Sequence, residues 1–305
     1  MIDIVGRRYL YFAISALVIL PGLIALAIWG PPAAAIDFTG GNLLEVRFEA
    51  SLRPAPAAAV ATAERLGIDD TLVQTAGESD LVIRSRPLEA DQKAQLLAAL
   101  ETEAGASVTV LRDEHVGPSI GAEVAQRAVG AVALAVLGIL GFITYAFRGV
   151  PHAARYGVAA ILAMLHDVLV VISVQVLLGR FLFWEIDALF LTALLTVIGF
   201  SVHDTIVVFD RIRENQRIYR RLRYETLVNH SIVQTLARSI NTQLTVTLTL
   251  LALLIFGGVT TQHFVTILLV GVLSGTYSSI FNAAPILVVW ENREWTGWFR
   301  RGSAV

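Results

Sequence analysis

The stretch that decides the fold is residues 188–210, ALFLTALLTVIGFSVHDTIVVFD. A helix rises about 1.5 Å per residue, so this run is long enough to cross the roughly 30 Å hydrocarbon core of a bilayer. Asp204 lies inside the run, although a charged side chain at membrane depth costs at least about 2.5–3.5 kcal/mol on insertion scales. The stretch therefore predicts a transmembrane helix that carries a functional acid.

Five further apolar stretches have the length of a membrane span, so six transmembrane helices are predicted. The first, roughly Tyr9 to Trp29, is too long for a signal-peptide core and lacks a convincing small-residue cleavage site, so we expect it to be kept as an anchor. The other four are residues 122–147, 155–178, 236–256 and 264–290.

The composition agrees with a membrane protein. Of the 305 residues, 55% are hydrophobic and only 16% are charged, which is more apolar than a soluble domain of this length can conceal. The chain contains no cysteine, which excludes a disulfide framework, thiolate metal ligands and a cysteine nucleophile.

Arginines orient the predicted bundle. They cluster before the first span, between the second and third, after the fourth and after the sixth: Arg7, Arg8, Arg148, Arg155, Arg211, Arg213, Arg217, Arg220, Arg221, Arg223, Arg293, Arg300 and Arg301. The alternate short loops hold only Arg180. The positive-inside rule then places both termini and the basic loops in the cytoplasm.

This orientation divides the chain into predicted domains. They are a cytoplasmic N-terminus with the first span (1–32), an exported interval (33–121), a helical bundle (122–292) with a basic cytoplasmic loop at about 211–233, and a cytoplasmic tail (293–305).

The exported interval alternates between strand-like and helix-like patterns. Short β-type runs at 43–48, 71–75, 81–84 and 107–112 are separated by helical patterns at 56–66 and 89–103. The order β-α-β-β-α-β is that of the ferredoxin-like α+β fold, in which two helices cover one face of an antiparallel sheet. The other face would be available for contacts.

Two more charged side chains lie at membrane depth. Asp167 is in the middle of the third span beside His166, and Arg238 enters the fifth span a turn or so from its cytoplasmic end. The depth of Arg238 suits an ion pair with Asp204 on the preceding antiparallel helix. Desolvation favours the neutral carboxyl and a nearby cation favours the charged one, and these opposing effects suit a proton carrier.

Less specific interpretations stay open. A static salt bridge between Asp204 and Arg238 would fix helix register without moving protons. His166 and His203 each adjoin an aspartate and project about 100° away from it around the helix, so we expect no shared metal site, and we expect no cofactor.

Small and hydroxylated residues in the later spans suit helix packing. Gly271 and Gly275 form a small-xxx-small pair in the sixth span, and we assign them to helix packing together with Gly199 in the fourth. Hydroxyl and amide side chains of the fifth and sixth spans are suited to interhelical hydrogen bonds. An open alternative is a hydroxyl row beside Asp204 that holds water for a proton path.

Motifs spread over nearly the whole chain resemble the SecF family of protein-export membrane subunits. In order, they are IDFTGG at 36–41, VGP at 116–118, LHDV at 165–168, DTIVVFDRIREN at 204–215, QTLARS at 234–239 and GTYSS at 275–279. Any one of these would be weak alone, whereas the ordered set is highly specific.

The resemblance implies a transport component rather than an enzyme. A SecD partner would supply the matching six-helix half of a bundle of the resistance-nodulation-division type, associated with the SecYEG channel. The complex would use the proton-motive force to complete preprotein export at a bacterial or archaeal cell (inner) membrane. Preproteins and membrane lipid are the other implied partners, and nucleic acid is not among them.

The resemblance also assigns residues. Asp204 and Arg238 match positions implicated in proton conduction, and we add Asp167, His203 and Thr205 to this predicted relay. The exported-domain motif is Asp37, Phe38, Thr39, Gly40 and Gly41.

The chain departs from the family pattern at two places. The family usually has asparagine where His203 stands and often tyrosine where Phe200 stands, so the local proton pathway is expected to differ.

Other functions remain as alternatives. One is a non-energetic scaffold for the translocon. Another is half of a small-molecule exporter of the resistance-nodulation-division type, although such exporters normally carry both six-helix halves in one chain. An intramembrane aspartyl protease built on Asp167 and Asp204 lacks the usual Gly-x-Gly-Asp nucleus around Asp204.

Overall fold

The computed structural model describes residues 2–49, 52–148, 153–182 and 184–294. Most of the predicted basic tail, including Arg300 and Arg301, lies outside these residues. The chain divides into a helical unit of residues 1–31, 132–181 and 192–305 and an α+β unit of residues 32–131 and 182–191.

Six helices among the described residues are long and apolar enough to cross a membrane, as the sequence predicts. The first five are α1 (Arg8–Trp29), α5 (Pro118–Ala146), α6 (Ala153–Leu182), α7 (Ala188–Ile218) and α8 (Tyr224–Phe256). The sixth combines α9 (Val259–Ser278), a π-helical turn (Ser279–Ala283) and α10 (Ala284–Glu291). Pro285 cannot donate a backbone hydrogen bond to residue 281, which weakens regular α-helical geometry at this turn.

Helical structure extends through most of the basic segment expected to be a loop. Because α7 continues to Ile218 and α8 begins at Tyr224, the connection is only residues 219–223. Asn215 explains the extension of α7. Its buried Nδ2 donates to Ser231 Oγ (2.8 Å) and Gln234 Oε1 (2.9 Å), which holds the end of α7 against α8.

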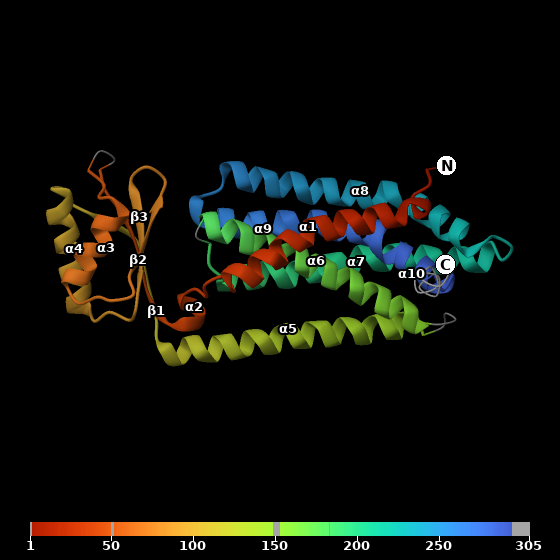
Figure 1. The fold of residues 1–305 in the computed structure, drawn as a ribbon, viewed down its shortest axis with the longest axis horizontal. Helices are drawn as coiled ribbons and strands as arrows, with labels where there is room; N and C mark the ends of the chain where they lie inside the picture. The colour runs from red at the N-terminus through yellow and green to blue at the C-terminus, as the bar shows by residue number, and fades with distance from the viewer. Residues whose placement is uncertain (1, 50–51, 149–152, 183, 295–305) are drawn as a thin grey trace, which may run out of the picture. The chain divides into compact units, whose positions relative to one another are not determined.

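The α+β unit contains a four-stranded antiparallel sheet with the order β2-β3-β1-β4. The strands are β1 (Gly41–Arg47), β2 (Leu72–Ala76), β3 (Asp80–Ser85) and β4 (Thr109–Val116). Helix α3 (Pro56–Arg65) connects β1 to β2, helix α4 (Ala90–Ala104) connects β3 to β4, and both helices lie on one side of the sheet (Figure 1). A short helix, α2 (Ile36–Thr39), precedes β1.

A single apolar core lies between the sheet and these two helices. Alternation along the strands turns Leu44 of β1 and Ile83 of β3 toward the helices, where Leu96 and Leu100 of α4 are fully buried. Each such side chain contributes roughly 1.5–3 kcal/mol relative to an exposed position. Helix α4 begins with a reciprocal capping box between Glu89 and the residue three positions later.

The opposite face of the sheet carries charged side chains held in ion pairs. Arg47 donates from Nε and Nη2 to the two carboxylate oxygens of Asp80, both at 2.8 Å, and Ser79 Oγ donates to Asp80 Oδ1 at 3.0 Å. The bidentate guanidinium holds the pKa of the Asp80 carboxyl below its usual value, because these bonds favour the ionised form.

The Arg47–Asp80 pair predicts a pH-dependent contribution to domain stability. A carboxyl whose pKa is lowered by folding stabilises the fold above its unfolded pKa of 3.8, and loses that contribution as the pH falls through the lower folded value. Asp80→Asn should therefore make the domain easier to unfold at pH 7, and this effect should disappear at a pH below the lowered folded pKa of Asp80. Limited proteolysis of the full chain in detergent at the two pH values measures this, and an equal effect at both would contradict it.

Candidate functional site

Asp204 lies in the membrane-spanning part of α7 and is 4% exposed. Gln243 of α8 donates from Nε2 to Asp204 Oδ2 at 2.8 Å. A cavity of about 210 Å³ adjoins the carboxylate and is lined by His203, Asp204, Val207, Arg238, Ser239 and Thr242. The acid is thus enclosed by protein but next to a space large enough for several water molecules.

The predicted ion pair between Asp204 and Arg238 is not present among the described residues, because Gln243 takes its place. Arg238 and Gln243 are five positions apart on α8, which separates them by about 140° around the helix and about 7.5 Å along it. Only one of them can reach the carboxylate directly. Arg238 instead lines the cavity beside Asp204 and is exposed.

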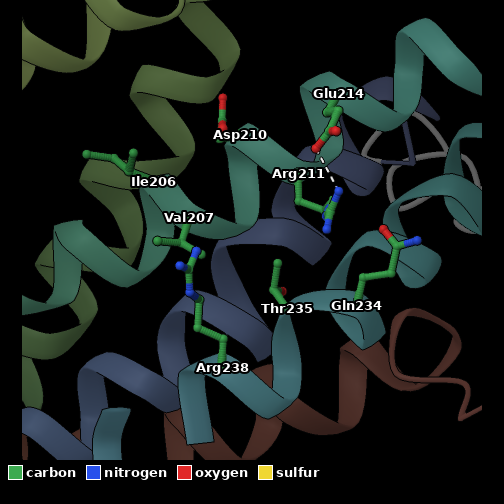
Figure 2. A pocket seen from close by; sticks show the side chains of 8 residues that line it. All are labelled: Ile206, Val207, Asp210, Arg211, Glu214, Gln234, Thr235 and Arg238. Atoms are coloured by element: carbon green, nitrogen blue, oxygen red, sulfur yellow. Dashed lines mark hydrogen bonds and ion pairs between the residues drawn. The ribbon is translucent and has the colours of Figure 1, made fainter. Parts of the chain in front are cut away.

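A second cavity, of about 440 Å³, lies between the C-terminal part of α7 and the N-terminal part of α8. The two cavities share Val207 and Arg238 in their walls. Figure 2 shows Arg238 extending toward Val207, with Asp210, Arg211 and Glu214 farther along α7. Arg211 Nη1 donates to Glu214 Oε2 at 2.7 Å on this wall. We call these two cavities together the vestibule, and Asp204 lines the smaller one.

Asp167 is completely buried and occupies a different environment from Asp204. Serine hydroxyls from two other helices donate to its carboxylate: Ser274 to Oδ1 (2.6 Å), Ser278 to Oδ2 (2.6 Å) and Ser201 to Oδ2. The Nδ1 atom of the neighbouring His166 lies 3.0 Å from Oδ1. This saturated carboxylate connects α6, α7 and α9.

The hydroxyl row of the sixth span belongs to this second cluster. Thr205 Oγ1 lies 2.8 Å from Ser279 Oγ, and Ser279 Oγ also donates to the Ser201 carbonyl at 3.2 Å. Thr205 therefore contacts the sixth span, whereas His203 is exposed on the vestibule side of α7. The structure thus separates the predicted relay residues into a cavity group and a buried hydroxyl group.

Two of the three predicted packing glycines lie at close helix contacts. A Cβ at Gly271 would be 2.0 Å from Val197 Cγ2, and one at Gly275 would be 3.2 Å from Ser201 Cα. These positions let α9 approach α7 closely enough for the serine–Asp167 bonds. At Gly199 a Cβ would meet nothing within 4 Å among the described residues, so the helix-packing role of Gly199 stays a prediction. Sequence reasoning missed Gly22, where a Cβ would be 2.2 Å from Ser173 Cβ.

The motif at residues 36–41 has a defined structural role in the α+β unit. Asp37 Oδ2 accepts a hydrogen bond from Ala188 N (2.8 Å), the first residue of α7. Gly40 and Gly41 have φ values of +76° and +142°, where side chains are strained, and a Cβ at Gly40 would lie 2.7 Å from Pro118 Cα. Thr39 Oγ1 donates to the Ala35 carbonyl at 3.1 Å, and Phe38 is half-buried beside it. The motif therefore caps the helix that carries Asp204.

Further contacts join the segment that precedes α7 to the rest of the α+β unit. The segment of residues 184–191 forms a parallel bridge between Ile186 and Ala34, with hydrogen bonds of 2.8 Å in both directions across it. Arg84 of β3 lies 3.2 Å from Glu185, with side chains only 21% and 11% exposed. Burial raises the pKa of the Glu185 carboxyl, Arg84 opposes this, and Asp187 adds to it. We call the Asp37, Arg84 and Glu185 contacts the latch.

Several of these residues could not be chosen from the sequence. Glutamine and serine are common in packed membrane helices, so Gln243 and the serines around Asp167 do not stand out in the sequence. Only the structure shows that these side chains donate hydrogen bonds to the buried carboxylates. Arg84 and Glu185 are 101 positions apart, and neither lies in a distinctive motif. A possible signal was the small-residue pair of the sixth span, which predicts a helix close enough to donate hydrogen bonds.

Comparison with known proteins places these features in a family. Residues 96–293 match the model of the C-terminal region of the protein export membrane proteins SecD and SecF. The "Protein translocase subunit SecF" of Anaerolinea thermophila is 57% identical over 99% of this chain and 98% of its own length. The protein of the same name from Thermobaculum terrenum is 48% identical, covering 99% and 98%.

Solved structures agree. The crystal structure of SecDF from Thermus thermophilus, titled a translocon-associated membrane protein, matches with a TM-score of 0.83 and 34% identity. The match covers 96% of this chain and 39% of that chain, so this chain spans well under half of the SecDF polypeptide. A second SecDF structure, in the super-membrane-facing form, matches with a TM-score of 0.68 over 99% and 40%.

The fold and the site define a multi-pass membrane protein of the transport class, with two buried carboxylates in its helical unit and a small antiparallel sheet in its α+β unit. The chain belongs to the SecF family of protein translocase subunits.

Proposed function

We propose that this chain couples proton movement to a late step of preprotein export, with Asp204 as the proton carrier. The observation that carries the proposal is the combination of burial, an adjoining cavity and a neutral hydrogen-bond partner at this carboxylate. A guanidinium in direct contact would favour the ionised form strongly, whereas the Gln243 amide can bond either form. Gln243 can therefore stay hydrogen-bonded to Asp204 in either protonation state.

In this proposal, protons move to Asp204 through the vestibule, and the charge of Arg238 favours the ionised form of the carboxylate. Protons reach Asp204 through the cavities, and the charge of Arg238 in the shared wall attracts the ionised carboxylate across the water-sized space. Protonation removes that attraction and changes how α7 packs against α8. One charge crossing 100 mV supplies about 2.3 kcal/mol, which biases a two-state helix arrangement but does not unfold a stable substrate. Several protons per export step are thus required.

Asp167 has a complementary part in this scheme. Its saturated carboxylate anchors α6, α7 and α9, so that α8 moves against a fixed group of helices. Thr205 extends the anchor through Ser279, and His203 stands at the vestibule, where an imidazole can exchange protons with water.

We propose SecD as the partner that covers the polar face of α8. Residues spaced by three or four positions form an exposed polar row at membrane depth: Arg238, Asn241, Thr242, Thr245 and Thr249. Arg238 makes no ion pair within the described part of the chain, and such a group facing lipid would be costly. In Thermus thermophilus a relative named SecDF, 39% identical over 85% of this chain, is about two and a half times as long, since the matched part covers 34% of it. We therefore expect the helices of SecD to pack against this polar face of α8.

Several finer assignments rest on the family and on local patterns. We assign the α+β unit to the ferredoxin-like class, because its strand order β2-β3-β1-β4 and its two helices on one face are those of that fold. By the positive-inside rule, the α+β unit lies outside, and both termini lie in the cytoplasm of a bacterial or archaeal cell. SecYEG and the preprotein enter the proposal through the family alone.

The latch couples the proton site to the α+β unit. Helix α7 begins where Asp37 accepts from Ala188 N and continues to Asp204. Glu185, two residues before Asp187 and next to the helix entrance, is held by Arg84 of the sheet. An axial shift of α7 would then act on α2 through Asp37 and on β3 through Arg84 and Glu185.

The proposed function is tested by collapsing the proton-motive force. Pulse-chase export of a slow-folding preprotein is compared between cells that contain the chain and cells depleted of it, with ATP maintained. A protonophore should abolish the difference between the two. If the difference persists at full size, the chain acts as a scaffold and the proton role is lost.

A further inference from the structure

A third cavity, of about 340 Å³, lies at one end of the helical unit, away from the vestibule residues. It is formed where α6 begins, α7 passes into α8 and α10 ends. Its walls are Arg155, Tyr156, Gln216, Arg220, Tyr224, Leu287 and Glu291. The proposed export function uses none of these side chains.

Tyr156 carries a polar atom that its packing does not explain. The ring stacks on Phe147 (centroids 5.4 Å apart) and meets Phe209 edge-on (5.3 Å), and the residue is 3% exposed. The hydroxyl is buried and makes no hydrogen bond of good geometry among the described residues, and Tyr224 and Gln216 are its polar neighbours in the cavity wall. A phenylalanine would pack equally well without the cost of a buried unpaired hydroxyl, roughly 1–3 kcal/mol. A donor retained at such a position points to a ligand in the cavity.

The charges of the cavity favour an anion. Arg155 is neutralised by its ion pair with Glu291. Arg220 is exposed and donates only from Nε to the Arg217 carbonyl (3.4 Å), and no acidic side chain of the described residues pairs with it. Two arginines and one glutamate leave a net charge of +1 in the walls. A guanidinium with free N–H groups beside two phenol hydroxyls is suited to phosphate oxygens.

We propose that this cavity binds the phosphate group of an anionic phospholipid. Arg220 would bind the phosphate oxygens, Tyr156 and Tyr224 would donate hydroxyl hydrogens to them, and Leu287 would contact the apolar part of the lipid. The cavity lies where membrane spans end, which is the level of lipid headgroups. Basic pockets between helix ends on the positive side of a membrane protein suit such headgroups.

Native mass spectrometry of the purified full chain tests the site. Detergent-solubilised protein is incubated with phosphatidylglycerol, phosphatidylcholine or inorganic phosphate, and the bound fraction is measured. Phosphatidylglycerol should be retained at least tenfold better than phosphatidylcholine. Arg220→Gln and Tyr156→Phe should each weaken its retention about tenfold, the size expected when a hydrogen bond to a charged group is lost.

Arg221→Gln is the matched control, because it removes the same charge from the next residue, which is exposed and does not line the cavity. It should retain phosphatidylglycerol like the wild type. Equal losses in Arg220→Gln and Arg221→Gln would show a diffuse charge effect and overturn the proposal. Millimolar inorganic phosphate that displaces the lipid would reassign the site to a soluble anion. Because Tyr156→Phe keeps the aromatic stack, an unaltered Tyr156→Phe complex would also count against it.

Discussion

Asp204→Asn should reduce chain-dependent export to nearly the level of cells that lack the chain. Asparagine keeps the shape and can still accept the Gln243 hydrogen bond, so the protein should accumulate normally. Asparagine cannot take up a proton. Each step therefore loses the roughly 50-fold change in the equilibrium constant that one charge crossing 100 mV provides. Pulse-chase secretion of a slow-folding preprotein, normalised to the amount of chain in the membrane, measures the loss.

Glu123→Gln is the control for this substitution. Glu123 lies near the start of α5, is exposed, pairs with Arg127 and does not line the vestibule. Export should stay within about twofold of the wild type, since exposed pairs contribute about 0–1 kcal/mol. Undiminished export by a stable Asp204→Asn chain would remove Asp204 from the proposed mechanism.

Breaking the latch should uncouple proton movement from export. The double variant Asp37→Asn with Arg84→Met weakens the charged cap of α7 and removes the ion pair with Glu185. Because a buried carboxylate would lose its cation, the local contact should weaken by several kcal/mol. We expect export to fall at least fivefold while the helical unit, and proton uptake by the chain with its partner in proteoliposomes, are preserved.

The control for the latch is Arg86→Gln. Arg86 lies just beyond β3, donates from Nη2 to the Gly67 carbonyl at 2.6 Å, and forms a surface pair with Asp69 at 3.7 Å, with side chains 48% and 73% exposed. This variant should export normally. Normal export by the double variant would mean that α7 does not act on the α+β unit through these contacts, whereas a loss of proton uptake together with export would indicate damage to the proton site instead.

The secondary structure was largely predictable because its signals are local. The alternating run at 43–48 became β1, Gly41–Arg47, and the amphipathic pattern at 89–103 became α4, Ala90–Ala104. The spans followed from length and apolarity alone. The boundary that differed most was the basic segment, where α7 continues to Ile218 because Asn215 finds partners on α8. That partnership is tertiary, and no local pattern reports it.

The sequence predicted which carboxylates belong to the candidate site, but it did not predict which side chains contact them. Asp204 and Asp167 stood out because charge in a membrane span is costly. Their partners depend on the rotation and register of the neighbouring helices. On α8, Gln243 bonds Asp204, whereas the predicted partner Arg238 lies five residues earlier. The glycine positions show the same dependence, because Gly271 meets Val197 while Gly199 meets open space.

The amino-acid sequence by itself determined which segments cross the membrane, which carboxylates are buried there and where the α+β unit is inserted. These properties follow from apolar length and periodicity, which act over a few helical turns. Tertiary structure alone decided that Asp167 is saturated by serines, that Asp204 adjoins a water-sized space, and that Asp37 caps the helix carrying Asp204. Each of these depends on side chains from distant segments meeting within about 3 Å, a distance that only the packed helices and sheet impose.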